Sequence, residues 1–125
     1  MRGALSLLVV LVPMPALAEG DVRPFDCTVT RTCTDAGNCI VDGSALEFAL
    51  APVSIGPDGT GLFELQTSIA TYSADLSADR RLSWASADWT QNDMIFTGPE
   101  TIVWIKRNFE PPQSELHFLT CKEAA

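Results

Sequence analysis

Residues 25–33 read FDCTVTRTC, a stretch dense in β-branched residues in which polar and apolar side chains alternate. A period of two is typical of a strand that buries one face and exposes the other. Strict alternation places Cys27, Val29 and Cys33 on the same face. The stretch therefore predicts a strand near the start of the folded domain, with cysteines on its buried face.

The remaining sequence reads as further short strands separated by Gly, Pro and polar residues. Strands are expected at residues 45–53, 62–66, 69–73, 81–86, 94–97, 101–107 and 115–121, with the strongest turn at 56–61. Strands at intervals of about 8–12 residues are typical of antiparallel sandwiches and barrels. No segment of helical length has a clean 3.6-residue period, and residues 73–84 are the best helical alternative. We predict an all-β fold: a single small antiparallel β-barrel or sandwich of about seven to nine short strands.

The first 18 residues have the composition of a cleavable export signal. Arg2 supplies a positive charge, residues 4–12 (ALSLLVVLV) form an uncharged apolar run, and residues 16–18 (ALA) have the small-x-small pattern that signal peptidase accepts. The apolar run is shorter than the roughly 20 residues of a membrane-spanning helix. We expect residues 1–18 to be a cleaved signal peptide and residues 19–125 to be a single β domain in the periplasm or secreted.

The chain holds four cysteines, and an even number in an exported protein favours disulfides. The turn-forming segment TDAGN separates Cys33 from Cys39, so these two can face each other across a hairpin. A bridge between Cys27 and Cys121 would then tie the first strand to the last, as a closed antiparallel barrel requires. Zinc is the alternative, with His117 able to replace one thiolate. Structural zinc ligands usually stand in pairs two to four residues apart, which this spacing lacks. We expect Cys33–Cys39 and Cys27–Cys121 disulfides and no metal.

The predicted mature chain is strongly acidic, with sixteen Asp and Glu and a net charge of about −9 once Arg2 is removed. Such a surface repels nucleic-acid phosphates and anionic lipids, and it favours a basic partner if the partner is a protein. We therefore expect no nucleic-acid partner, no membrane insertion after cleavage, and a monomer.

Signatures of catalysis are missing from the sequence. His117 is the only histidine, no nucleophilic-serine motif accompanies it, and it should point opposite to Leu116 and Phe118 as a surface or partly packed residue. Asp88 and Asp93 flank Trp89, an arrangement that could hydrolyse a glycoside. Acidic residues are so frequent in this chain that the proximity is ordinary. We expect no catalytic residues, no enzyme activity and no cofactor.

The candidate binding surface consists of one polar stretch and a basic doublet. Trp89 lies within ADWTQND (residues 87–93), where it is either an exposed contact residue or a cover over one end of a barrel. Arg80 and Arg81 form one basic doublet, and Lys106 and Arg107 form another. Each doublet could bind an anion or a carboxylate, or it could merely offset the acidic surface. Trp84 and Trp104 stand in alternating strands and are expected to be buried. The possible binding surface therefore comprises Trp89, Asp88, Asp93, Arg80 and Arg81.

In outline the chain is similar to small periplasmic lysozyme-inhibitor barrels. The resemblance consists of its size, an N-terminal and a C-terminal strand that each carry cysteine, and the segment Trp104-Ile105-Lys106. Residues 83–88 are nearest to the serine- and glycine-rich inhibitory loop of that family, but they lack its glycine, so no inhibitory residue is assigned.

These features predict an exported, non-catalytic binding protein that acts on an unknown protein partner through an acidic surface. An inhibitor of a basic cell-wall hydrolase of lysozyme type is one alternative, because opposite charges would steer the two together. The other alternative is a lipocalin-like carrier that holds a small apolar ligand inside the barrel.

Overall fold

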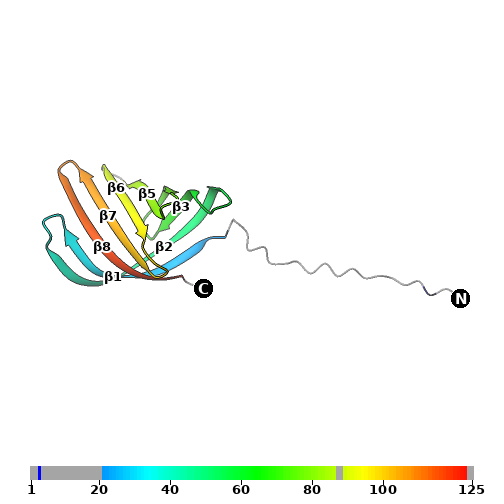
Figure 1. Cartoon of the computed structure of the whole chain (residues 1–125), viewed down its shortest axis with the longest axis horizontal. Coiled ribbons are helices and arrows are strands. Elements are labelled where there is room, and N and C mark those ends of the chain that lie inside the picture. Colours follow the sequence, from blue (N-terminus) through cyan, green and yellow to red (C-terminus); the bar gives the residue numbers. More distant parts are fainter. Residues whose placement is uncertain (1–2, 4–20, 87–88, 124–125) are drawn as a thin grey trace.

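Short β-rich segments joined by tight turns build a closed antiparallel barrel of eight strands, which decides between the barrel and the sandwich (Figure 1). The computed structural model describes residues 3, 21–86 and 89–123. The strands are β1 (Arg23–Thr34), β2 (Cys39–Ile55), β3 (Gly61–Thr67), β4 (Thr71–Leu76), β5 (Arg81–Ser86), β6 (Thr90–Phe96), β7 (Thr101–Phe109) and β8 (Pro112–Glu123). Each strand pairs with the next, and β8 pairs with β1. The predicted all-β fold is confirmed.

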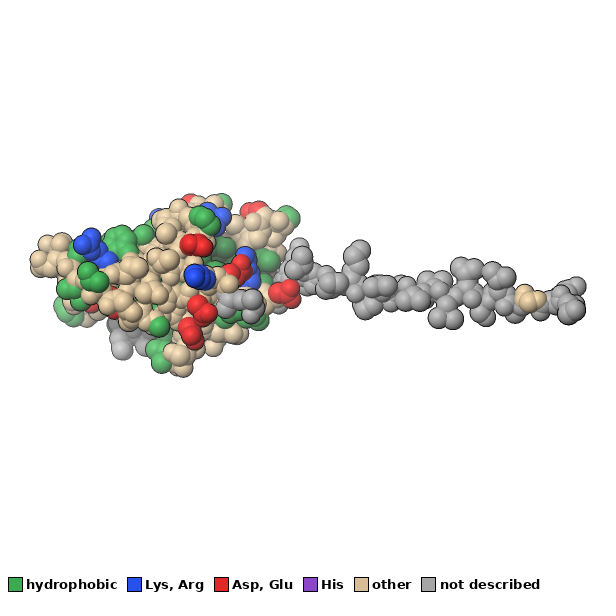
Figure 2. All heavy atoms as spheres, turned by 90° about the horizontal axis from the view of Figure 1, so that it is seen from below, with side chains coloured by type: hydrophobic (Ala, Val, Ile, Leu, Met, Phe, Trp, Pro, Cys, Tyr) green, Lys and Arg blue, Asp and Glu red, His purple; other side chains and the backbone are tan. Residues whose placement is uncertain are grey.

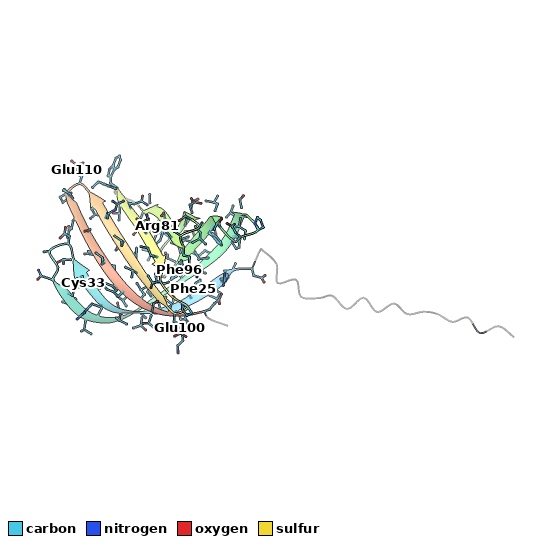
Figure 3. All side chains as sticks on the ribbon, viewed as in Figure 1. Phe25, Cys33, Arg81, Phe96, Glu100 and Glu110 are labelled. Atoms are coloured by element: carbon cyan, nitrogen blue, oxygen red, sulfur yellow. A yellow bond between two sulfur atoms is a disulfide. The ribbon has the colours of Figure 1, made fainter. Side chains whose placement is uncertain are left out.

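Because consecutive strands run in opposite directions, the turns alternate between the two ends of the barrel. The β1–β2, β3–β4, β5–β6 and β7–β8 turns lie at one end, which we call the rim end. The other three turns lie with the start of β1 and the finish of β8 at what we call the terminal end. Figure 3 shows Cys33 and Glu110 toward the rim end, and Phe25, Phe96 and Glu100 toward the terminal end.

Both predicted disulfides are present. Cys27 and Cys121 face each other across β1 and β8, with their Cα atoms 4.0 Å apart and a sequence separation of 94. Cys33 and Cys39 close the β1–β2 hairpin. One bridge therefore locks the seam of the barrel and the other locks a hairpin at the rim end.

A β-bulge in β1 places Cys33 on the opposite face from the one that alternation predicts. The register of β1 shifts between Val29 and Arg31 against both neighbouring strands. An extra residue in one strand reverses the direction of every side chain that follows it. Cys27 and Val29 belong to the core cluster, whereas Cys33, although buried, does not. The expectation that all three share one face was therefore wrong.

The core fills the middle of the barrel with apolar side chains from all eight strands. Leu65 and Leu82 are among its most buried members, and stacked Phe25 and Phe48 extend it toward the terminal end. Trp84 is buried as expected, and Trp104 is half-buried against the cluster. Burial of these inward positions is the main source of stability for the barrel.

Several strands begin earlier in the sequence than predicted. β2 begins at Cys39 rather than at residue 45, and β6 begins at Thr90 rather than at residue 94. The helical alternative at residues 73–84 is wrong, because β4 and β5 occupy that segment with a turn between them. The predicted turn at 56–61 is confirmed, and Gly61 is needed there because a Cβ would lie 2.3 Å from the Ser54 carbonyl oxygen.

The predicted signal peptide lies outside the described residues except for Gly3, and it stays a prediction. In the described part of the chain, no helix is long and apolar enough to cross a membrane.

The two disulfides close loops of very different length, so their removal should have different costs. On the chain-entropy model, replacing Cys27 and Cys121 with Ala should lower the free energy of unfolding by about 4–5 kcal/mol, against about 2–3 kcal/mol for Cys33 and Cys39. Urea denaturation of the two double variants under oxidising conditions measures both values. Equal losses, or a larger loss for the hairpin bridge, would contradict the seam role of Cys27–Cys121.

Candidate functional site

The rim end of the barrel opens into a cavity of about 450 Å³. Inward side chains of Phe48, Leu65 and Met94 line it and belong to the central core. Closer to the rim, the inward positions of β5 and β6 change to the smaller polar residues Ser86 and Asn92. The interior is therefore filled in the middle of the barrel and left open near the rim.

A short hydrogen-bond chain fixes the wall of this cavity. Nε1 of Trp104 donates to Oδ1 of Asn92 at 3.1 Å, and Nδ2 of Asn92 donates to Oγ of Ser86 at 3.0 Å. Asn92 is only 1% exposed, and these two bonds satisfy both ends of its amide. The Ser86 hydroxyl accepts in this chain and keeps its own proton for a further acceptor.

Aromatic rings and one cation complete the wall. Trp84 and Trp104 lie with their ring centroids 6.1 Å apart. Nζ of Lys106 lies 4.8 Å from the centroid of the Trp104 ring, a cation–π contact. Lys106 is half-buried and lines the cavity. The site thus combines an apolar floor, two indole rings, the Lys106 ammonium group and several polar residues, of which Glu47 is acidic and Thr67, Ser68, Tyr72 and Ser86 carry hydroxyls.

His117 lies beside the cavity wall and is part-buried, with 14% of its side chain exposed. Its ring lies 5.1 Å from that of Trp104. Nδ1 lies 2.9 Å from Oγ1 of Thr32, which donates its one proton to Asp42, so Nδ1–H of the imidazole donates to Thr32. Nε2 is buried without a hydrogen bond, 3.4 Å from Oε2 of Glu115.

The pKa of His117 lies below its usual value. Burial is the largest cause, because it disfavours the charged ring, and the positive charge of Lys106 acts in the same direction. The carboxylates of Glu115 and Asp42 oppose the effect without reversing it. The imidazole is therefore neutral near pH 7, and Lys106 is the cation of this wall.

All four hairpins of the rim end expose large apolar side chains. We call this set the apolar rim, and its members are Ile40, Val41, Ile69, Trp89 and Phe109. Val41, Ile69 and Trp89 are 83%, 86% and 79% exposed. Toward the terminal end Val22, Val53 and Leu62 are exposed as well, at 49%, 60% and 37%, beside rather than within the turns. The four most exposed large apolar side chains among the described residues nevertheless lie at the rim end. In Figure 2, seen from below, most of the visible Asp and Glu side chains lie toward the terminal end.

The backbone of Trp89 is left-handed, with a φ of +62°. Arg80, which likewise directly precedes a strand, has a φ of +63°, and left-handed residues are common in short hairpin loops. The exposure of the Trp89 side chain, rather than its backbone, is therefore the feature that core packing does not explain.

The predicted surface residues do not form a single patch. Trp89 belongs to the apolar rim, whereas Arg80 and Arg81 lie at the terminal end, where Arg81 Nε is 3.8 Å from Asp79 Oδ2. Asp93 lies in β6 and accepts a 2.5 Å hydrogen bond from Ser83. Asp88 lies outside the described residues.

Sequence reasoning missed Ser86 and Asn92 as members of a site, and it named Lys106 as a possible anion-binding residue without placing it inside the barrel. Lys106 was grouped with Arg107 as a basic doublet. Alternation along β7 contained the needed signal, because Ile102, Trp104 and Lys106 occupy every second position and so point to the same side. Among the described residues, no group of three or more His, Cys, Asp or Glu side chains is placed to hold a metal ion.

No protein-family model, curated protein or solved structure matches the chain. The chemistry of the rim end is therefore the basis for the function proposed below.

The low pKa of His117 predicts a specific acid sensitivity. Between the usual pKa of about 6.5 and the lower folded value, the unfolded chain binds a proton that the folded chain does not. The free energy of unfolding should therefore be at its full value above pH 6.5 and should fall on acidification below it. The carboxylates with lowered pKa values, Asp42, Asp58 and Asp79, lose their contribution only below about pH 4.

Urea denaturation of the wild type and His117→Asn between pH 7.5 and 5 tests this expectation. The wild type should lose stability across this range, and the variant should be nearly flat. Parallel curves for the two proteins would show that His117 does not cause the acid sensitivity.

Proposed function

We propose that the protein is a non-catalytic binder or carrier of a small, largely apolar molecule, which it holds in the rim-end cavity. The observation that carries the proposal is the opening of this cavity at the end of the barrel that bears the apolar rim. Ligand pockets in proteins range from about 300 to 1,000 Å³ and are mostly apolar with a few placed polar groups. Eight-stranded barrels are just wide enough for one small ligand.

The rim supports the proposal independently of the cavity. Exposed apolar side chains such as Val41 and Ile69 have no partner within the described structure and add nothing to the core. Ile69 of the rim also lines the cavity, where it can contact a ligand as it passes from water into the interior.

The proposed place of action is outside the cytoplasm. Two disulfides persist in an oxidising compartment and are rare where thiols are kept reduced. Together with the signal-like residues 1–18, they support the periplasm or secretion.

A second candidate is a protein partner that docks on the apolar rim. Trp89 favours it, because its side chain is 79% exposed and tryptophan is enriched among the residues that contribute most to protein interfaces. The acidic charge of the chain would steer a basic partner such as a cell-wall hydrolase of lysozyme type.

Native mass spectrometry of protein purified without detergent tests the carrier. A bound molecule should appear as extra mass that leaves on collisional activation. Uptake of the neutral fluorophore N-phenyl-1-naphthylamine should give a saturable signal. Leu46→Trp, which places an indole in the cavity, should reduce the affinity for the fluorophore at least tenfold.

Val53→Trp is the matched control, because it adds the same indole to an exposed position of the same strand. Both variants should unfold cooperatively. A bare monomer that takes up no fluorophore would overturn the carrier and favour a protein partner at the rim.

A further inference from the structure

We infer that the ligand is an anionic amphiphile, an apolar body with a single carboxylate that pairs with Lys106 in the rim-end cavity. This inference rests on the proposed function and names the class of molecule that the site would take.

The first support is the position of Lys106 inside the barrel. On β7 it follows Trp104 at the next inward position, and both side chains line the cavity. The neighbouring cation Arg107 points to the other face, where its guanidinium lies 5.5 Å from the centroid of the exposed Phe109 ring. Of the two adjacent cations, one faces the cavity and the other faces water.

The second support is that Lys106 has no ion pair among the described residues, although Glu47 also lines the cavity. Among the described residues, no carboxylate oxygen lies within 4 Å of the Lys106 ammonium. Glu115 is directly opposite Lys106 on β8, but its carboxylate lies against Nε2 of His117 instead. A half-buried ammonium loses part of its hydration, and the Trp104 ring offsets only part of that loss.

The terminal end shows the contrasting arrangement. A second cavity there, of about 370 Å³, is lined in part by Arg23, whose Nε lies 2.8 Å from Oε1 of Glu123. That cation is already paired within the chain. Arg80 also lines that cavity and has no carboxylate oxygen within 4 Å among the described residues, but it is exposed, whereas Lys106 is a half-buried cation without an ion pair.

The arrangement of the cavity gives the ligand a direction. Lys106 is nearer the rim than Trp104 on β7, while Phe48, Leu65 and Met94 belong to the central core. A carboxylate at Lys106 therefore leaves the apolar body to extend inward along Trp84 to this floor. The Ser86 hydroxyl lies on the same wall and can donate to an oxygen of the ligand.

Three molecules with the same ten-carbon chain test the charge preference: decanoate, 1-decanol and decylammonium. Each molecule is titrated against protein with bound N-phenyl-1-naphthylamine at pH 7.5, at concentrations below the critical micelle concentration of that molecule, and loss of the fluorescence signal measures its affinity. Decanoate should bind about tenfold or more tightly than decanol, because a charge-assisted hydrogen bond contributes more than a neutral one. Decylammonium should bind most weakly.

Lys106→Met removes the charge and keeps an unbranched apolar side chain. It should reduce the preference for decanoate over decanol to about one. Lys106→Arg should keep the preference. Arg107→Met is the matched control, because it removes the adjacent outward cation and should change neither affinity.

The outcomes separate this inference from the function on which it rests. If the chains bind but the wild type shows no preference for decanoate, or if Lys106→Met keeps that preference, the anionic ligand is overturned and the carrier stands. If neither the fluorophore nor any ten-carbon chain binds the wild type, both the carrier and its anionic ligand are overturned.

Discussion

The pairing of β8 with β1 is the constraint on which the rest of the structure depends. Eight strands in sequence order form a sheet with two free edges, and each edge would present unpaired N–H and C=O groups to water or to other chains. The ladder from Phe25 to Thr34 removes both edges at once, and the Cys27–Cys121 bridge fixes its register. Closure creates an inside, and only then does alternation along a strand decide which side chains enter a confined interior.

Register within this seam has consequences that extend to the rim. Before the bulge between Val29 and Arg31, the inward positions of β1 contribute to the apolar core. After it, Oγ1 of Thr32 lies within hydrogen-bond distance of Nδ1 of His117, and Cys33 lies outside the core cluster. A single extra residue thus changes the interior of the seam from apolar packing to a hydrogen-bonded network of Thr32, His117 and Asp42. That network lies next to the Trp104 ring and so supports one wall of the cavity.

Sequence reasoning reached the features that depend on local pattern. Alternation and turn residues predicted the strands, and the TDAGN turn predicted the Cys33–Cys39 bridge, which left Cys27 for Cys121. It could not reach features that depend on how strands meet. A bulge is a property of pairing between β1 and its two neighbours, and nothing in FDCTVTRTC marks it. The apolar rim consists of residues far apart in sequence, such as Val41 and Phe109. They lie at the same end of the barrel only because the up-and-down topology places their turns there.

Three features of the rim end lower the free energy of unfolding of the protein. Its interior is left open where larger apolar side chains could fill it, and an unfilled core lowers stability in proportion to its volume. Its hairpins hold apolar side chains in water, and its inner wall holds an ammonium group that forms no ion pair with a described carboxylate. Each of these costs would be removed by simple substitutions at Ser86, Ile69 or Lys106.

A single amphipathic ligand would offset all three costs, because it would fill the cavity, cover apolar surface near the mouth and neutralise the charge. The terminal end also holds a cavity, of about 370 Å³, but its turns are polar and Arg23, which lines that cavity, is paired with Glu123. The coincidence of these three costs at one end of the barrel is therefore the strongest argument that this end binds a molecule.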